Sequence, residues 1–78
     1  MNDYEQIVSV IAKQLQIDVS KIRPDTLIVE ELGADSLDII EILMELENLY
    51  SISVPDEIIV NFKTPSDILV YLQEIQNK

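Results

Sequence analysis

The sequence predicts an all-α fold, a small four-helix bundle with three longer helices and one short third helix. Three observations favour this class. Apolar residues recur at helical spacing, cap residues stand where helices would begin, and no strand pair is convincing. The segment 52–54 alternates between apolar and polar residues, but no obvious partner strand exists for it. At 78 residues, the chain is predicted to form one domain, residues 1–78, with a small core.

The first helix is predicted to begin at a cap, Asn2 or Asp3, and to run to about Gln16. The helical spacing of three apolar residues places them on one face: Val8, Ile11 and Leu15. A long connection over residues 18–31 follows, with a turn predicted at residues 24–26. The connection and its end are too apolar for a free loop, so we expect these side chains to pack onto the core: Ile22, Leu27, Ile28 and Leu32.

The second helix is predicted from about Ser36 to Tyr50. Gly33, the only glycine, interrupts the chain before it, Asp35 is a good N-cap, and Asp38 completes a spacing like that of a capping box. At about 100° per residue, this helix presents three surfaces. The predicted core stripe holds Ile39, Ile42, Leu43, Leu46, Leu49 and Tyr50, the acidic edge holds Asp38, Glu41 and Glu45, and a separate apolar patch holds Leu37, Ile40 and Met44.

Two interpretations of the apolar patch are open. A neighbouring helix could cover it, or it could be a docking surface for a partner, since exposed apolar residues rimmed by charge often mark interaction sites.

The third helix is predicted from Asp56 to about Asn61, and the fourth begins with a Thr64 cap and Pro65 at its first position. The run Ile58-Ile59-Val60 cannot all face inward from one short helix. We therefore expect Ile58 or Val60 to be exposed.

Composition excludes several functions. The chain has no cysteine and no histidine, so we expect no zinc site and no Ser-His or Cys-His catalysis, and an enzyme is not favoured. The net charge of −10 argues against nucleic acid and anionic membranes. No apolar run suits a membrane span. The N-terminal residues Met-Asn-Asp-Tyr-Glu have neither the positive start nor the apolar core of a signal peptide, so the chain is expected to be cytoplasmic. The calcium loop pattern with its central glycine is missing, so no dedicated metal site is expected.

The acidic residues are concentrated in one part of the chain. Residues 24–62 contain no lysine or arginine, yet they hold ten of the fifteen acids. Such a run can be simply a solvated surface. Its placement beside an apolar patch on the second helix instead favours steering of basic partner proteins.

Ser36 stands at the predicted start of the second helix. It could be an ordinary polar residue of the first turn, a nucleophile, or a site of attachment. A nucleophile needs a base, and Asp35 and Asp38 are poor bases at neutral pH. The positive end of a helix favours an anion, so an attached phosphodiester would be stabilised there.

The segment Leu32-Gly33-Ala34-Asp35-Ser36-Leu37-Asp38 closely resembles the prosthetic-group site of acyl carrier proteins. Residues 55–57 resemble the family's turn into its third helix, and residues 64–65 its entry into the last helix. The resemblance implies that a phosphopantetheinyl transferase moves 4'-phosphopantetheine from coenzyme A onto Ser36. The chain would then carry acyl groups as thioesters, as a monomer that is not itself an enzyme.

The resemblance also assigns two further groups of residues. Acyl-transferring and synthase enzymes with basic docking patches would meet Asp35, Leu37, Asp38, Glu41, Met44, Glu45, Asp56 and Glu57. Glu47 lies off this edge. An acyl chain would fold back among Ile39, Ile42, Leu46, Val54, Ile59, Phe62, Ile68, Tyr71 and Leu72, which would also serve as core.

The third helix departs from the family pattern, because it has fewer acids and larger apolar residues than carriers of fatty acid synthesis usually have. Three functions therefore stay open. The first is a carrier for fatty acid biosynthesis, and the second is a specialised carrier for polyketide, aminoacyl or lipid-modification chemistry. The third is an unmodified helical adaptor between proteins, for which Ser36 would be dispensable.

Overall fold

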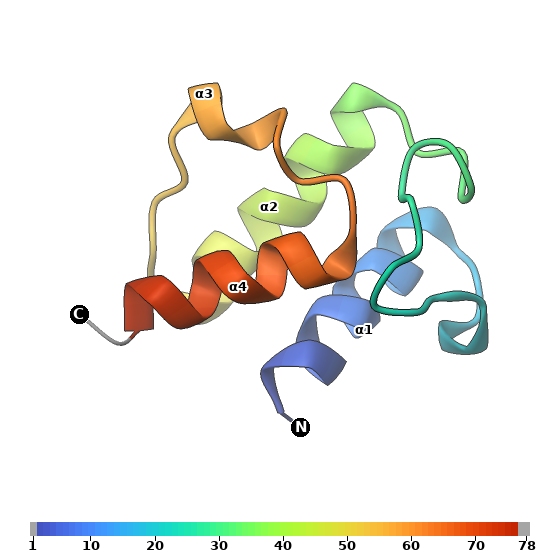
Figure 1. The fold of residues 1–78 in the computed structure, drawn as a ribbon, viewed down its shortest axis with the longest axis horizontal. Coiled ribbons are helices and arrows are strands. Elements are labelled where there is room, and N and C mark those ends of the chain that lie inside the picture. Colours follow the sequence, from blue (N-terminus) through green and yellow to red (C-terminus); the bar gives the residue numbers. More distant parts are fainter. Residues whose placement is uncertain (1, 77–78) are drawn as a thin grey trace.

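A computed structural model describes residues 2–76 (Figure 1). This part of the chain forms α1 (Asp3–Leu15), a 3-10 turn η1 (Val19–Lys21), α2 (Ser36–Tyr50), α3 (Asp56–Ile59) and α4 (Pro65–Gln76), with no strand. The all-α prediction is confirmed, and α3 ends two residues earlier than expected. The predicted domain 1–78 also includes Met1, Asn77 and Lys78, which lie outside the described residues.

Side chains cap α1, α2 and α4 at their predicted starts, whereas α3 has no side-chain cap. In α1 the cap is Asn2, whose Oδ1 accepts the Glu5 N–H at 2.8 Å, while Glu5 accepts the Asn2 N–H in return. At α4, Thr64 Oγ1 accepts the Asp67 N–H at 3.2 Å, and the Asp67 carboxylate accepts the Thr64 N–H at 3.1 Å. Such caps satisfy backbone groups that have no partner within the helix.

The core forms where α1 packs against α2 and α4, so the three longer helices surround it (Figure 1). The connection between α1 and α2 also contributes. As predicted, Ile22 and Ile28 are buried in the core and Leu32 packs against it, whereas Leu27 is half-buried and does not belong to the core cluster. Two backbone hydrogen bonds tie this connection to the segment around the start of α4. The Ile28 N–H donates to the Lys63 carbonyl at 2.9 Å, and the Ser66 N–H donates to the Pro24 carbonyl at 3.1 Å.

One residue of the predicted core stripe is exposed. Leu49 was expected inside but is an exposed large hydrophobic residue. In the helical projection Leu49 lies at the margin of the stripe, next to the acidic edge. A helical projection gives only the direction in which a side chain points, and burial also needs a neighbouring element on that side.

Among residues 2–76, no helix is both long and apolar enough to cross a bilayer.

Candidate functional site

Ser36 is the first residue of α2, and its side chain is exposed. Just before it, Asp35 forms a complete capping box with Asp38. Asp35 Oδ1 accepts the Asp38 N–H at 2.8 Å, and Asp38 Oδ2 accepts the Asp35 N–H at 3.1 Å. Gly33 precedes this box with a φ of 77°, in the left-handed region that favours glycine. This turn places the Ser36 hydroxyl at the positive end of α2.

The surroundings of Ser36 favour attachment over catalysis. Both adjacent carboxylates accept backbone N–H groups in the capping box. Among the hydrogen bonds of residues 2–76, none joins either carboxylate to the Ser36 hydroxyl. The chain also has no histidine that could act as a base toward this oxygen.

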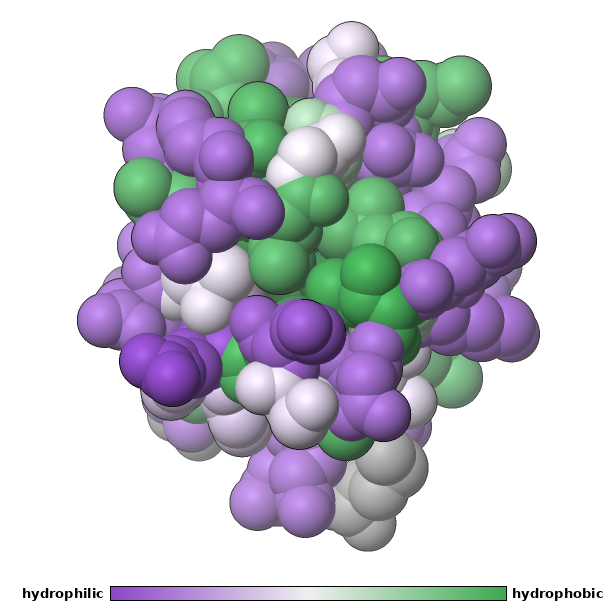
Figure 2. All heavy atoms as spheres, turned by 90° about the vertical axis from the view of Figure 1, so that its right-hand side faces the viewer, coloured by the Kyte–Doolittle hydropathy of each residue, from purple (hydrophilic) through white to green (hydrophobic). Residues whose placement is uncertain are grey.

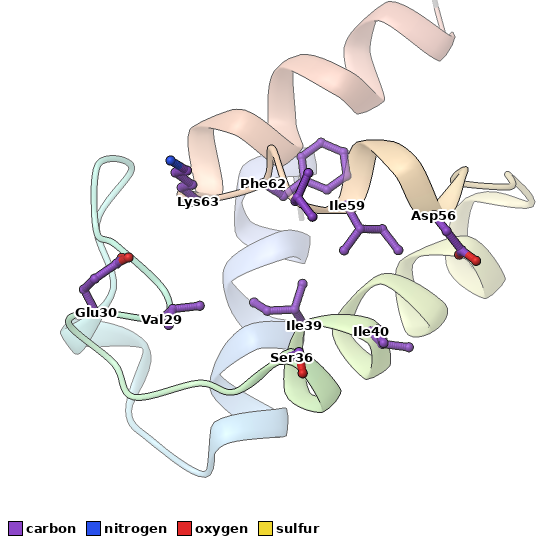
Figure 3. Close-up of a pocket in the computed structure, with 10 residues that line it drawn as sticks. Val29, Glu30, Ser36, Ile39, Ile40, Asp56, Ile59, Phe62 and Lys63 are labelled. Carbon is purple, nitrogen blue, oxygen red and sulfur yellow. The ribbon is translucent and has the colours of Figure 1, made fainter.

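A groove of about 790 Å³ opens beside Ser36 (Figure 3). It lies between the start of α2, the α3 segment and the connection before α2. In Figure 3, Ile39 and Ile59 extend toward each other across it, and Val29 points into the same space from the connection. Its lining is mainly apolar and consists of Val29, Glu30, Ser36, Ile39, Ile40, Asp56, Ile59, Val60, Phe62 and Lys63.

The predicted acyl-pocket residues divide into two groups. Ile39, Ile59 and Phe62 line the groove, whereas the other six do not. Of those six, Tyr71 is half-buried and contacts Phe62 edge-on, with ring centroids 5.3 Å apart. The remaining five are buried in the core: Ile42, Leu46, Val54, Ile68 and Leu72.

The predicted docking residues are almost all accessible. Asp38, which also belongs to the capping box, is half-buried, and the following are exposed: Asp35, Leu37, Glu41, Met44, Glu45, Asp56 and Glu57. Leu37 and Met44 are each more than half exposed, and Ile40 is exposed as well. No described element covers the apolar patch of α2, so the interpretation in which a neighbouring helix buries it is wrong.

Comparison with known proteins identifies the family. Residues 5–72 match the family model described as a phosphopantetheine attachment site. The chain belongs to the acyl carrier protein family. It is 37% identical to the acyl carrier protein of Helicobacter hepaticus over 94% of this chain and 96% of that protein. It is 45% identical to the acyl carrier protein of onion yellows phytoplasma, over 88% of this chain and 91% of that protein. It is 38% identical to the acyl carrier protein of Helicobacter pylori, over 91% of each of the two proteins.

The cofactor of this acyl carrier family is 4'-phosphopantetheine, and the site fits it in two respects. An exposed hydroxyl at the positive end of α2 suits a phosphodiester linkage. The groove that begins at Ser36 has an apolar lining and a volume in the range of small-molecule sites, which is about 300–1,000 Å³.

Sequence reasoning missed several residues of the groove and of the surface near it. Val29, Glu30 and Lys63 line the groove, although they lie in the connection and in the segment before α4. Their sequence neighbourhood carries no periodic signal. Gln14 was also missed: its Nε2 donates to Glu41 Oε2 at 2.6 Å and lies 3.4 Å from Asp38 Oδ1. A neutral amide facing two carboxylates of another helix cannot be found without knowing how the helices pack.

Glu47 makes a contact within the fold, unlike the acids predicted to dock partners. Glu47 Oε2 accepts the Val54 N–H at 2.6 Å, so Glu47 holds the segment between α2 and α3.

In residues 2–76, no group of three or more metal-ligating side chains lies close enough together to hold a metal ion.

Proposed function

We propose that this chain carries acyl groups as thioesters on a 4'-phosphopantetheine arm attached to the Ser36 Oγ, and presents them to partner enzymes of fatty acid biosynthesis. The observation that carries the proposal is the exposed Ser36 hydroxyl, held at the start of α2 and at the edge of an apolar groove. The arm supplies the thiol that a chain without cysteine lacks.

In this proposal the chain positions Ser36 and a partner supplies the catalysis. The capping box of Asp35 and Asp38 fixes the first turn of α2, and thereby the place of the hydroxyl. The hydroxyl proton leaves to a base of the phosphopantetheinyl transferase as the oxygen bonds to the pantetheine-side phosphorus of coenzyme A. The pyrophosphate bond of coenzyme A breaks in the same step, and adenosine 3',5'-bisphosphate leaves. The N-terminal dipole of α2 then stabilises the phosphodiester, an effect of about 0.3–1 kcal/mol at an exposed position.

The exposed acids of α2 and α3 are proposed to dock the partners. Glu41 and Glu45 lie along α2, and Asp56 and Glu57 form the first turn of α3. Basic patches on the transferase and on acyl-transferring and synthase enzymes would complement them, which accelerates encounter and selects orientation. Residues 1–78 are proposed to act as one monomeric carrier domain.

The experiment is intact-mass measurement after incubating the apo chain with coenzyme A and a broad-specificity phosphopantetheinyl transferase. Wild type should gain one phosphopantetheine, and Ser36→Ala should gain none. Ser53→Ala is the matched control, because Ser53 is also exposed but lies in the segment between α2 and α3. It should be modified like wild type. A folded wild-type chain that several transferases leave unmodified would refute the proposal and favour an unmodified adaptor.

A further inference from the structure

Three exposed apolar residues from different parts of the chain surround the groove beside Ser36. Val29 comes from the connection, Ile40 from α2, and Val60 from the residue directly after α3. Their exposed fractions are 45%, 42% and 74%, respectively. We call these three residues the apolar collar. Each is unremarkable as a single surface residue, but all three line the same groove as Ser36.

A backbone hydrogen bond joins the connection that carries Val29 to the segment that follows Val60. Ile28, next to Val29, is fully buried, and its N–H donates to the Lys63 carbonyl at 2.9 Å. On the other side, the Phe62 N–H donates to the Ile59 carbonyl at 3.1 Å, so the turn that contains Val60 is closed. The collar is therefore built into the fold before any partner arrives.

The collar is more exposed than the floor of the groove. Ile39 and Phe62 are buried and Ile59 is half-buried, whereas all three collar residues are exposed. Val60 follows α3 directly and is exposed, whereas Ile58 and Ile59, the last two residues of α3, are half-buried. The floor can shelter an apolar group within the groove. The collar points outward, which suits a protein surface laid over the groove.

Charge beside the collar indicates the chemistry of that protein. Glu30 and Asp56 line the same groove, with Lys63 as its one cation. The chain as a whole has a net charge of −10, which favours a basic partner at this place. Figure 2 shows apolar side chains gathered within hydrophilic ones on the side that carries the connection between α1 and α2. Apolar surface framed by charge is typical of a docking site.

We propose that the collar is the apolar part of the docking surface for the phosphopantetheinyl transferase, whose contact face would pair an apolar side chain with surrounding cations. The inference rests on the proposed function, because the transferase must reach the Ser36 hydroxyl. Any enzyme that does so covers the mouth of this groove. During loading the chain carries no acyl group that could occupy the groove, so the collar is free to contact the enzyme.

The test is steady-state loading of the apo chain, with kcat and KM measured separately. Val60→Thr replaces a methyl group by a hydroxyl and nearly keeps the shape. Val70→Thr is the matched control, because Val70 is 53% exposed on α4 and does not line this groove. We expect Val60→Thr to raise KM about three- to tenfold with little change in kcat, since burying a whole valine side chain corresponds to about tenfold in affinity. Val70→Thr should match wild type.

A second variant and a salt series complete the test. Val29→Thr, on the opposite side of the groove, should raise KM in the same direction. The ratio of variant to wild-type KM should stay constant between low and moderate salt, because an apolar contact is not screened. The inference is overturned if Val60→Thr and Val29→Thr both load with the wild-type KM. In that case wild-type loading at Ser36 would still support the carrier, whereas wild type that cannot be loaded would refute the proposed function itself.

Discussion

The Gln14 side chain of α1 donates a hydrogen bond of 2.6 Å from Nε2 to Glu41 Oε2 of α2. The same nitrogen lies 3.4 Å from Asp38 Oδ1, one turn earlier on α2. A neutral donor thus joins α1 to two acids of the proposed docking surface. A lysine in this place would cancel one negative charge, whereas the amide restrains both carboxylates and leaves the charge of the surface intact.

Replacing Gln14 by alanine should destabilise the fold modestly. The lost hydrogen bond to a charged, partly exposed acceptor is worth about 1 kcal/mol. For a domain of this size, that corresponds to a decrease in Tm of about 4–8 °C. Thermal unfolding followed by circular dichroism checks the value. Gln73→Ala is the control, because Gln73 is exposed on α4 and should leave Tm nearly unchanged. Equal Tm values for the two variants would show that the bridge between α1 and α2 contributes nothing.

Reversing the charge of Glu41 should weaken loading more than folding. Glu41→Lys places a cation where a basic partner is proposed to dock, so kcat/KM should fall about five- to tenfold at low salt. Glu74→Lys makes the same change of charge at an exposed position on α4 and is the control. The difference between the two variants should shrink as salt rises, because exposed charges are screened. Equal loading by both variants at low salt would remove Glu41 from the docking surface.

Salt should raise the melting temperature of the wild-type chain. Residues 24–62 hold ten acids and no lysine or arginine, so the folded state concentrates repulsion. Raising NaCl from about 10 to 200 mM shortens the Debye length from about 30 Å to under 10 Å and weakens this repulsion. The double variant Glu41→Gln, Glu45→Gln should show a smaller increase in Tm over the same range. A wild-type Tm that does not change with salt would contradict strong self-repulsion.

Alkaline pH should destabilise the chain through Tyr50. Burial and the hydrogen bond of 3.0 Å that its hydroxyl donates to Asp3 raise the pKa of Tyr50 from 10.0 to about 12. A raised pKa means that the folded state holds the proton more tightly than the unfolded state. This stabilisation is complete below pH 10 and is lost as the pH rises from 10 to about 12.

The variant Tyr50→Phe tests this assignment by chemical denaturation. It removes one hydrogen bond between α2 and α1, so it should cost about 1 kcal/mol at neutral pH. Its free energy of unfolding should also fall less than that of wild type between pH 10 and 12, because this group no longer titrates. Parallel pH curves for the two proteins would show that Tyr50 is not the group responsible.

Local signals in the sequence sufficed for the helices and for the proposed attachment residue. Asp35 and Asp38 predicted a capping box at the start of α2, and Thr64 predicted the start of α4; both are present. Ser36 stood out because the segment from Leu32 to Asp38 resembles the prosthetic-group site of acyl carrier proteins, whereas its place at a helix start alone left an ordinary polar residue possible. These features depend on residues within about four positions of one another, and hydrogen bonds at a helix end are equally local.

Contacts between distant segments required the tertiary structure. The groove brings Val29, Ile40 and Val60 together from three segments, and Gln14 reaches Glu41 across 27 positions in the sequence. Leu49 was assigned to the core by its direction, yet no element covers it. A periodic pattern specifies which way a side chain points from its own helix. Only the packing of helices and connections decides what lies opposite, so the sequence alone determined the helices and Ser36, and the fold decided the groove, the collar and the bridge.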